Sequence, residues 1–62
     1  MKVVIEAKRE VYSLEQLGSS MTVRELIAEL SEYDGDLEVA VSSDGGYSFG
    51  ALKRWDISAK ND

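Results

Sequence analysis

The segment TVRELIAEL, residues 22–30 of the 62-residue chain, decides the fold. It opens with Thr22 and Glu25 at the spacing of a capping box, in which each side chain binds a backbone N–H at the start of a helix. Apolar residues then recur at positions i, i+3, i+4 and i+7, namely Val23, Leu26, Ile27 and Leu30. This spacing is typical of an amphipathic helix, which we predict over residues 23–33. We expect Gly35 to end it in the left-handed conformation.

Segments in which apolar and polar residues alternate, with a period of two, flank this helix. Before it, residues 2–12 place Val3, Ile5, Ala7 and Val11 on one side and charged residues on the other. After it, residues 37–43 alternate in the same way around Leu37, Val39 and Val41. Alternation of this kind is typical of a strand with one buried face, so we predict a strand in each segment.

The sequence Asp44-Gly45-Gly46-Tyr47 predicts a tight hairpin turn, because such turns need residues with positive φ. A third strand should follow over residues 47–57. With Gly45 and Gly46 at the centre of the turn, Val39 faces Leu52, and Glu38 faces Lys53 on the other side of the sheet. The alternation slips at residues 53–55, which predicts a bulge.

The expected order is therefore strand, helix, strand, strand. A chain of 62 residues has room for one domain, residues 1–62, and its last five residues form a polar, flexible tail. We predict a small α+β fold, β-α-β-β, in which one helix packs on one face of a three-stranded sheet. The helical crossover allows the first two strands to be parallel.

One helix leaves the second face of the sheet uncovered. The residues expected there include Val4, Tyr12, Ala40 and Phe49, and Trp55 is a further candidate. Exposed apolar surface of this extent marks interaction sites. We therefore predict a homo-oligomer, formed through this face or by pairing of strand edges. A monomer with a partly hydrated sheet is the alternative.

The composition argues against several functions. The chain has no Cys and no His, so it lacks disulfides, the usual nitrogen and sulfur metal ligands, and the usual nucleophile and base pairs. We expect no enzyme, no cofactor and no metal site. The net charge of −5 opposes direct binding to nucleic acid or to a membrane surface. No apolar run is long enough for a signal peptide or a membrane span, so we expect a cytoplasmic protein.

Aromatic and cationic side chains gather along the third strand. They form our candidate ligand site: Tyr47, Phe49, Lys53, Arg54 and Trp55, joined by Arg9 if the first strand lies nearby. Aromatic rings stack on bases and cations bind phosphates, so this composition predicts a nucleotide-type ligand. The same composition is typical of protein interfaces, and a plain hairpin with Trp55 in the core is a further interpretation.

Acidic side chains gather on the helix and the turn after it. Residues 15–44 hold eight acidic residues and one basic residue, a net charge of −7. The candidate partner-binding residues are Glu25, Glu29, Glu32, Asp34 and Asp36. Such a surface fits a basic partner that is attracted by charge. A solvated helix face is the alternative.

Residues 21–47, MTVRELIAELSEYDGDLEVAVSSDGGY, resemble a pattern found in short bacteriophage and prophage proteins, in which a TVxELIxxL helix leads through a tyrosine and an acidic turn into a strand. The resemblance implies a phage accessory protein made in a bacterial cytoplasm. It carries over no binding or catalytic residue, and this chain has Gly35 where such proteins often have proline.

Small phage proteins of this kind often act against host immunity by binding. The resemblance therefore leads to an inhibitor of bacterial anti-phage defence that sequesters a nucleotide-type signal at a subunit junction. One alternative is an acidic protein that docks on a basic, nucleic-acid-binding surface of a host defence protein such as a CRISPR effector. A structural or regulatory phage protein is the other alternative.

Overall fold

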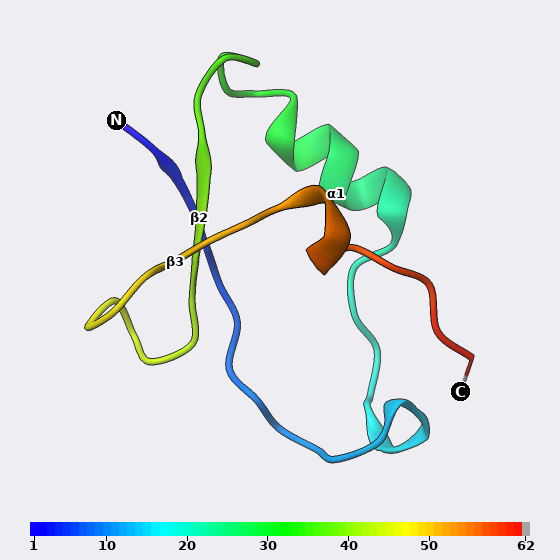
Figure 1. Ribbon diagram of the computed structural model, residues 1–62. Coiled ribbons are helices and arrows are strands. Elements are labelled where there is room, and N and C mark those ends of the chain that lie inside the picture. The colour runs from blue at the N-terminus through cyan, green and yellow to red at the C-terminus, as the bar shows by residue number, and fades with distance from the viewer. Residues whose placement is uncertain (62) are drawn as a thin grey trace.

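The computed structural model describes residues 1–61, which form a three-stranded mixed sheet and one α-helix (Figure 1). The elements are β1 (Val3–Glu6), η1 (Leu14–Gln16), α1 (Val23–Leu30), β2 (Val39–Ser42), β3 (Gly50–Ala51) and η2 (Arg54–Asp56), where η denotes a single 3-10 turn. The sheet order is β1-β2-β3, with β1 parallel and β3 antiparallel to β2. The small α+β fold with β-α-β-β order is confirmed.

The strand register divides the side chains between two faces. Val3 pairs with Val39 and Ala40 pairs with Ala51, which is the register expected from the turn. We call the side that carries Val3, Ile5, Val39, Val41 and Leu52 the helix-side face. The opposite side carries Val4, Ala40, Ala51 and Phe49, and we call it the open face.

The start of α1 is confirmed in detail. Glu25 N donates to Thr22 Oγ1 at 3.1 Å, and Thr22 N donates to Glu25 Oε1 at 2.9 Å, which completes the capping box. The helix ends at Leu30, three residues earlier than expected.

The expected left-handed conformation at Gly35 is wrong, since only Gly45 and Gly46 have positive φ within residues 1–61. The Asp34 carboxylate accepts from Asp36 N at 2.9 Å, so a side chain stabilises this turn instead.

All three strands are shorter than their alternation predicts. The pairing of β1 ends where Ala7 N donates to Ser42 O at 3.0 Å, because β2 then enters the hairpin loop. At the other end of the sheet, the expected bulge at residues 53–55 is wrong. The Asp56 carboxylate accepts from Lys53 N at 2.8 Å and closes η2, which turns the chain away from β2.

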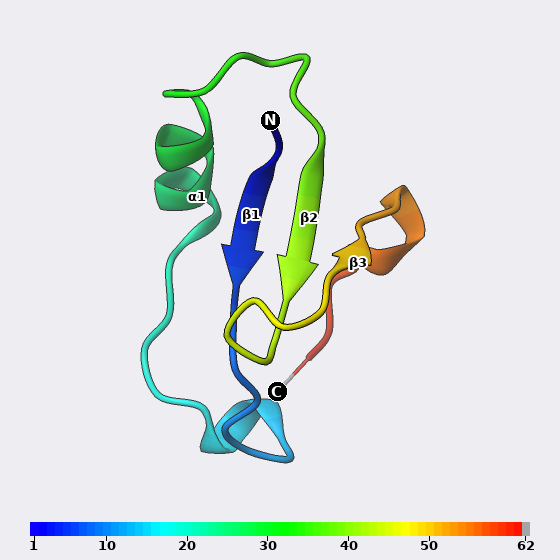
Figure 2. The same cartoon turned by 90° about the vertical axis from the view of Figure 1, so that its left-hand side faces the viewer.

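The helix lies on one side of the sheet, as expected, but its apolar stripe stays open. In Figure 1 α1 and η2 lie on the same side of the sheet, and Figure 2 shows α1 beyond β1 and η2 beyond β3. No Cα atom of α1 comes within 8 Å of a strand Cα atom. Val23 and Ile27 are 77% and 62% exposed. Among residues 1–61, Ser42 at 6% exposure is the one buried residue, so no apolar core is closed within a single chain.

The remaining segments are irregular. Residues 58–61 of the expected tail have no regular structure and are exposed, and Asp62 lies outside the described residues. The α-helix within residues 1–61 has eight residues, and no helix there is long and apolar enough to span a membrane.

Candidate functional site

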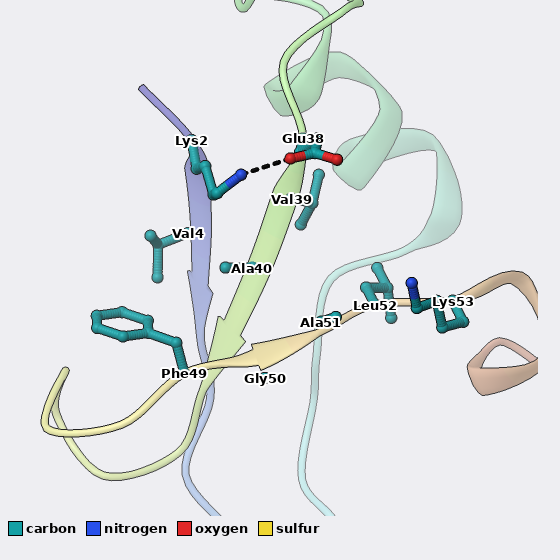
Figure 3. Close-up of a pocket in the computed structure, with 10 residues that line it drawn as sticks. All are labelled: Lys2, Val4, Glu38, Val39, Ala40, Phe49, Gly50, Ala51, Leu52 and Lys53. Atoms are coloured by element: carbon teal, nitrogen blue, oxygen red, sulfur yellow. Dashed lines mark hydrogen bonds and ion pairs between the residues drawn. The ribbon is translucent and has the colours of Figure 1, made fainter.

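A hollow of about 720 Å³ lies on the open face (Figure 3). We call it the open-face hollow, and its lining residues come from the start of β1, from β2 and from β3 with its flanks: Lys2, Val4, Glu38, Val39, Ala40, Phe49, Gly50, Ala51, Leu52 and Lys53. Val39 and Leu52 reach it from the helix-side face. It brings together segments from the beginning, middle and end of the chain.

The floor of the open-face hollow is apolar because the register aligns small and branched side chains. Val4 lies opposite Ala40, and Ala40 lies opposite Ala51, so three neighbouring strands present three apolar side chains in a row. The ring of Phe49 projects from the approach to β3 on the same side as Val4, and it is 61% exposed (Figure 3). The ring therefore offers a free aromatic face beside an apolar floor.

The upper end of the hollow is charged. Lys2 and Glu38 directly precede the paired residues Val3 and Val39, and they form an ion pair and hydrogen bond across β1 and β2. The hydrogen bond from Lys2 lowers the pKa of Glu38, and the charges of Lys2 and then Lys53 lower it further. With Lys53, which lies beyond Leu52 in Figure 3, two lysines and one carboxylate give the lining a charge of +1, in a chain whose net charge is −5.

The structure places two of the six predicted ligand residues at the hollow. Phe49 and Lys53 line it. The other four do not: Tyr47 lies in the hairpin loop, Arg54 and Trp55 lie in η2, and Arg9 lies in the irregular segment after β1. The reason is local, because the chain leaves the sheet at Lys53 and the backbone of η2 lies on the helix side of the sheet (Figure 1). Whether these residues bind a ligand stays a prediction.

Eight of the ten lining residues were not among the predicted ligand residues, and three of these eight show why. Lys2 and Val4 belong to the alternating set on the charged side of the first strand, and Glu38 occupies the corresponding place in the second strand. The signal that could have found them is the parallel register, which puts Lys2 beside Glu38 once Val3 is paired with Val39.

The hairpin loop positions Phe49 through a network around Asp44. The Asp44 carboxylate accepts from Ser42 Oγ at 3.0 Å and from Ser48 N at 3.0 Å, and the Ser48 hydroxyl donates to its second oxygen. Hydrogen bonds from Ser48, first from its hydroxyl and then from its backbone, lower the pKa of Asp44 to about 2. The network holds the loop just before Phe49.

Two further hydrogen bonds tie the glycines of this loop to the sheet. Gly46 N donates to Ser42 Oγ at 3.1 Å, and Gly45 N donates to Glu6 Oε2 at 3.1 Å. The φ angles of Gly45 and Gly46 are 78° and 92°, in the region that L-residues avoid. The two glycines are therefore needed for the geometry of the loop.

The predicted acidic surface follows the outer side of α1 and the turn after it. Two of its carboxylates bind backbone groups: Glu25 completes the capping box, which lowers its pKa, and Asp34 binds Asp36 N. In residues 1–61 the one ion pair joins Lys2 and Glu38, so none of the acidic residues on this surface has a basic partner within 4 Å.

Within residues 1–61, no three acidic side chains lie close enough together to hold a metal ion. Comparisons of the chain with protein-family models, with curated proteins and with solved structures found no match.

The chemistry of the open-face hollow, with an aromatic ring, an apolar floor and two lysines, suits a ligand that is flat at one end and anionic at the other.

Proposed function

We propose that this protein is a non-catalytic binding protein that sequesters a small nucleotide-type ligand in the open-face hollow. The observation that carries the proposal is the separation of Phe49 and Lys53 at two ends of one apolar floor. A base stacks on the ring while its phosphate reaches the ammonium group. The volume of about 720 Å³ falls within the range of roughly 300–1,000 Å³ that is usual for small-molecule sites.

The charges support an anionic ligand. Lys2 holds Glu38 as an ion pair, so the carboxylate next to the site is neutralised and Lys53 remains to meet a phosphate. The hollow of one chain already contains both recognition elements. The proposal therefore requires only the hollow of one chain, and a ligand site shared between two subunits would be an extension of it.

The setting of the proposal comes from the resemblance to phage accessory proteins. In that setting the ligand is a signalling nucleotide of a bacterial defence system, and the protein inhibits the system by removing the signal. The place of action is then the cytoplasm of the bacterial host.

The test is a panel of cyclic mononucleotides, cyclic dinucleotides and ADP-ribose derivatives, each added at 1 mM while the melting temperature is recorded. At least one compound should raise the melting temperature, and calorimetry should give its dissociation constant. Loss of base stacking costs about 1–3 kcal/mol, so Phe49→Ser should weaken binding roughly 5- to 150-fold. Absence of any shift across the panel contradicts the proposal.

Matched controls lie directly beside the two residues. Tyr47→Ser removes an aromatic ring two positions from Phe49, and Arg54→Gln removes a cation next to Lys53, but neither residue lines the hollow. We expect Phe49→Ser and Lys53→Gln to weaken binding and the two controls to leave it unchanged. Equal losses in a variant and its control would place the ligand elsewhere.

The unpaired acidic surface favours a second candidate function, which is docking on a basic surface of a host defence protein. Glu29, Glu32 and Asp36 are the residues to test, because their side chains make no hydrogen bond within residues 1–61. A partner captured at low salt should be released at high salt and should not bind a chain with Glu29→Gln, Glu32→Gln and Asp36→Asn. Capture that survives these substitutions contradicts the second function.

A further inference from the structure

The helix side of the sheet is covered by too little protein. An α-helix is about 10 Å wide with its side chains, and neighbouring strands lie about 4.8 Å apart, so one helix covers about two strands. Here α1 lies beyond β1 and η2 beyond β3, and β2 lies between them (Figures 1 and 2). A second hollow of about 500 Å³ opens at the hairpin end of the sheet, where Ile5, Ala7 and Val41 line it together with residues of the hairpin loop, and no residue of α1 or η2 lines it.

The surface area of the chain shows the same shortage. The accessible area is 6057 Å², whereas a compact monomer of this mass exposes roughly 4,000 Å² and the unfolded chain roughly 10,000 Å². A single chain thus hides about 40% of its unfolded surface, where a domain of this size hides about 60%. The excess is about 2,000 Å² per chain.

Part of the exposed apolar surface lies along one flank of α1. Leu30 is half-buried and Leu26 is 40% exposed, whereas Val23 and Ile27 are the most exposed residues of the stripe. One flank of the stripe is thus partly covered, and the other flank, Val23 and Ile27, is exposed. The carboxylates of α1 lie on the opposite side of the helix, away from this flank.

We propose that a second copy of this chain covers the helix-side face, with the two α1 helices lying side by side between the two sheets. In this dimer Val23 and Ile27 of each helix pack over the uncovered β2 region of the other copy. The contact is the same on both sides, as expected for a two-fold dimer. If each copy hides its excess of about 2,000 Å², the interface totals about 4,000 Å², which lies in the range of obligate dimers.

A second copy fits better than a different protein for two reasons. The helix side of β2 has room for one amphipathic helix, and each chain carries one helix with an exposed apolar flank. Two copies that place α1 on each other's sheet would therefore bury both surfaces. The two chains each carry a charge of −5, and the carboxylates of α1 face away from the contact, which keeps like charges apart. This dimer leaves uncovered the residues of the open-face hollow that lie on the open face, namely Val4, Ala40, Ala51 and Phe49, and it does not rest on the proposed function.

Sedimentation and single-cysteine cross-linking test the proposal. The wild-type chain should sediment at about twice 6.9 kDa at 100 μM. The chain has no Cys, so Ile27→Cys provides one defined thiol for oxidation between copies. We expect Ile27→Cys to form a covalent dimer at least tenfold faster than either Ala28→Cys, on the acidic side of α1, or Val4→Cys, on the open face.

A 6.9 kDa species at 100 μM would overturn the proposal. Fastest cross-linking through Val4→Cys would also overturn it, because the copies would then meet through the open face. Ile27→Glu should shift the wild-type dimer to monomer or unfold the chain, and Val4→Glu should leave the dimer intact. If Ile27→Glu unfolds, the cross-linking rates still decide. Nucleotide binding is measured separately, so failure of the dimer and failure of the proposed function can be distinguished.

Discussion

Lys2 and Glu38, which are separated by 36 positions in the sequence, form an ion pair across the starts of the parallel strands β1 and β2. The pair lies at the upper end of the open-face hollow, which Lys53 also lines. It therefore joins two strands and also sets the charge that a ligand would meet. Both side chains are exposed, so its effect on ionisation should be easier to measure than its effect on stability.

The first prediction concerns the pKa of Glu38. Because Lys2 lowers this pKa by a hydrogen bond and by its charge, Lys2→Met should raise it toward its usual value. Titration of the carboxyl carbon by NMR, followed between pH 2 and pH 7, gives both values. Lys8→Met is the matched control, because Lys8 does not line this site. An unchanged pKa in Lys2→Met would mean that the ion pair does not form in solution.

The second prediction concerns the capping box of α1. Thr22→Ala removes the side chain that accepts from Glu25 N and should lower the free energy of unfolding by about 1 kcal/mol. Ser13→Ala is a matched control, because Ser13 precedes η1 without forming a side-chain cap. Urea denaturation at one fixed protein concentration measures both variants. Equal destabilisation by the two substitutions would contradict the specific role of Thr22.

The third prediction concerns the hairpin glycines. Gly46→Ala forces a Cβ atom into a conformation with φ of 92°, which should cost about 1 kcal/mol. Gly35→Ala is the control, since Gly35 does not have positive φ and a Cβ atom there meets nothing within 4 Å. That substitution should stabilise the chain by roughly 0.5 kcal/mol through the unfolded state. Melting temperatures that move in the same direction for both variants would disagree with the loop geometry.

The fourth prediction concerns acid stability. The pKa of Asp44 is lowered from 3.8 to about 2 in the folded chain, so its stabilising effect is complete above about pH 4 and is lost as the pH falls through about 2. Asp44→Asn removes this dependence, so the melting temperature of the variant should fall less between pH 5 and pH 2 than that of the wild type. Asp36→Asn removes one carboxylate without touching the Ser48 network, and it should retain the wild-type pH dependence.

Features that depend on neighbouring residues could be predicted from the sequence. The capping box of Thr22 and Glu25 and the positive φ angles of Gly45 and Gly46 were confirmed, together with the register that pairs Ala40 with Ala51, although the loop between β2 and β3 is longer than a tight turn. Each is decided by backbone groups only a few positions from the residues that bind or turn them. The left-handed conformation expected at Gly35 failed for a local reason as well, since the Asp34 side chain offered a competing turn.

The composition of the candidate site could be predicted only in part. Phe49 and Lys53 were expected and line the open-face hollow, whereas Arg54 and Trp55 were expected and do not. Alternation assumes that a strand continues, but Asp56 binds Lys53 N and ends the extended chain at that residue. Lys2 could not be recognised as a neighbour of Glu38 until the parallel pairing of β1 and β2 was known.

The sequence by itself determined where the helix begins, where the hairpin turns and which strand residues share a face, because these features follow from capping, positive φ and the two-residue period of a strand. Only the tertiary structure decided that Lys2 meets Glu38, that η2 carries Trp55 away from the open face, and that Val23 and Ile27 stay exposed. These outcomes depend on the distance between segments that are far apart along the chain. No local pattern specifies that distance, because packing contacts throughout the molecule determine it.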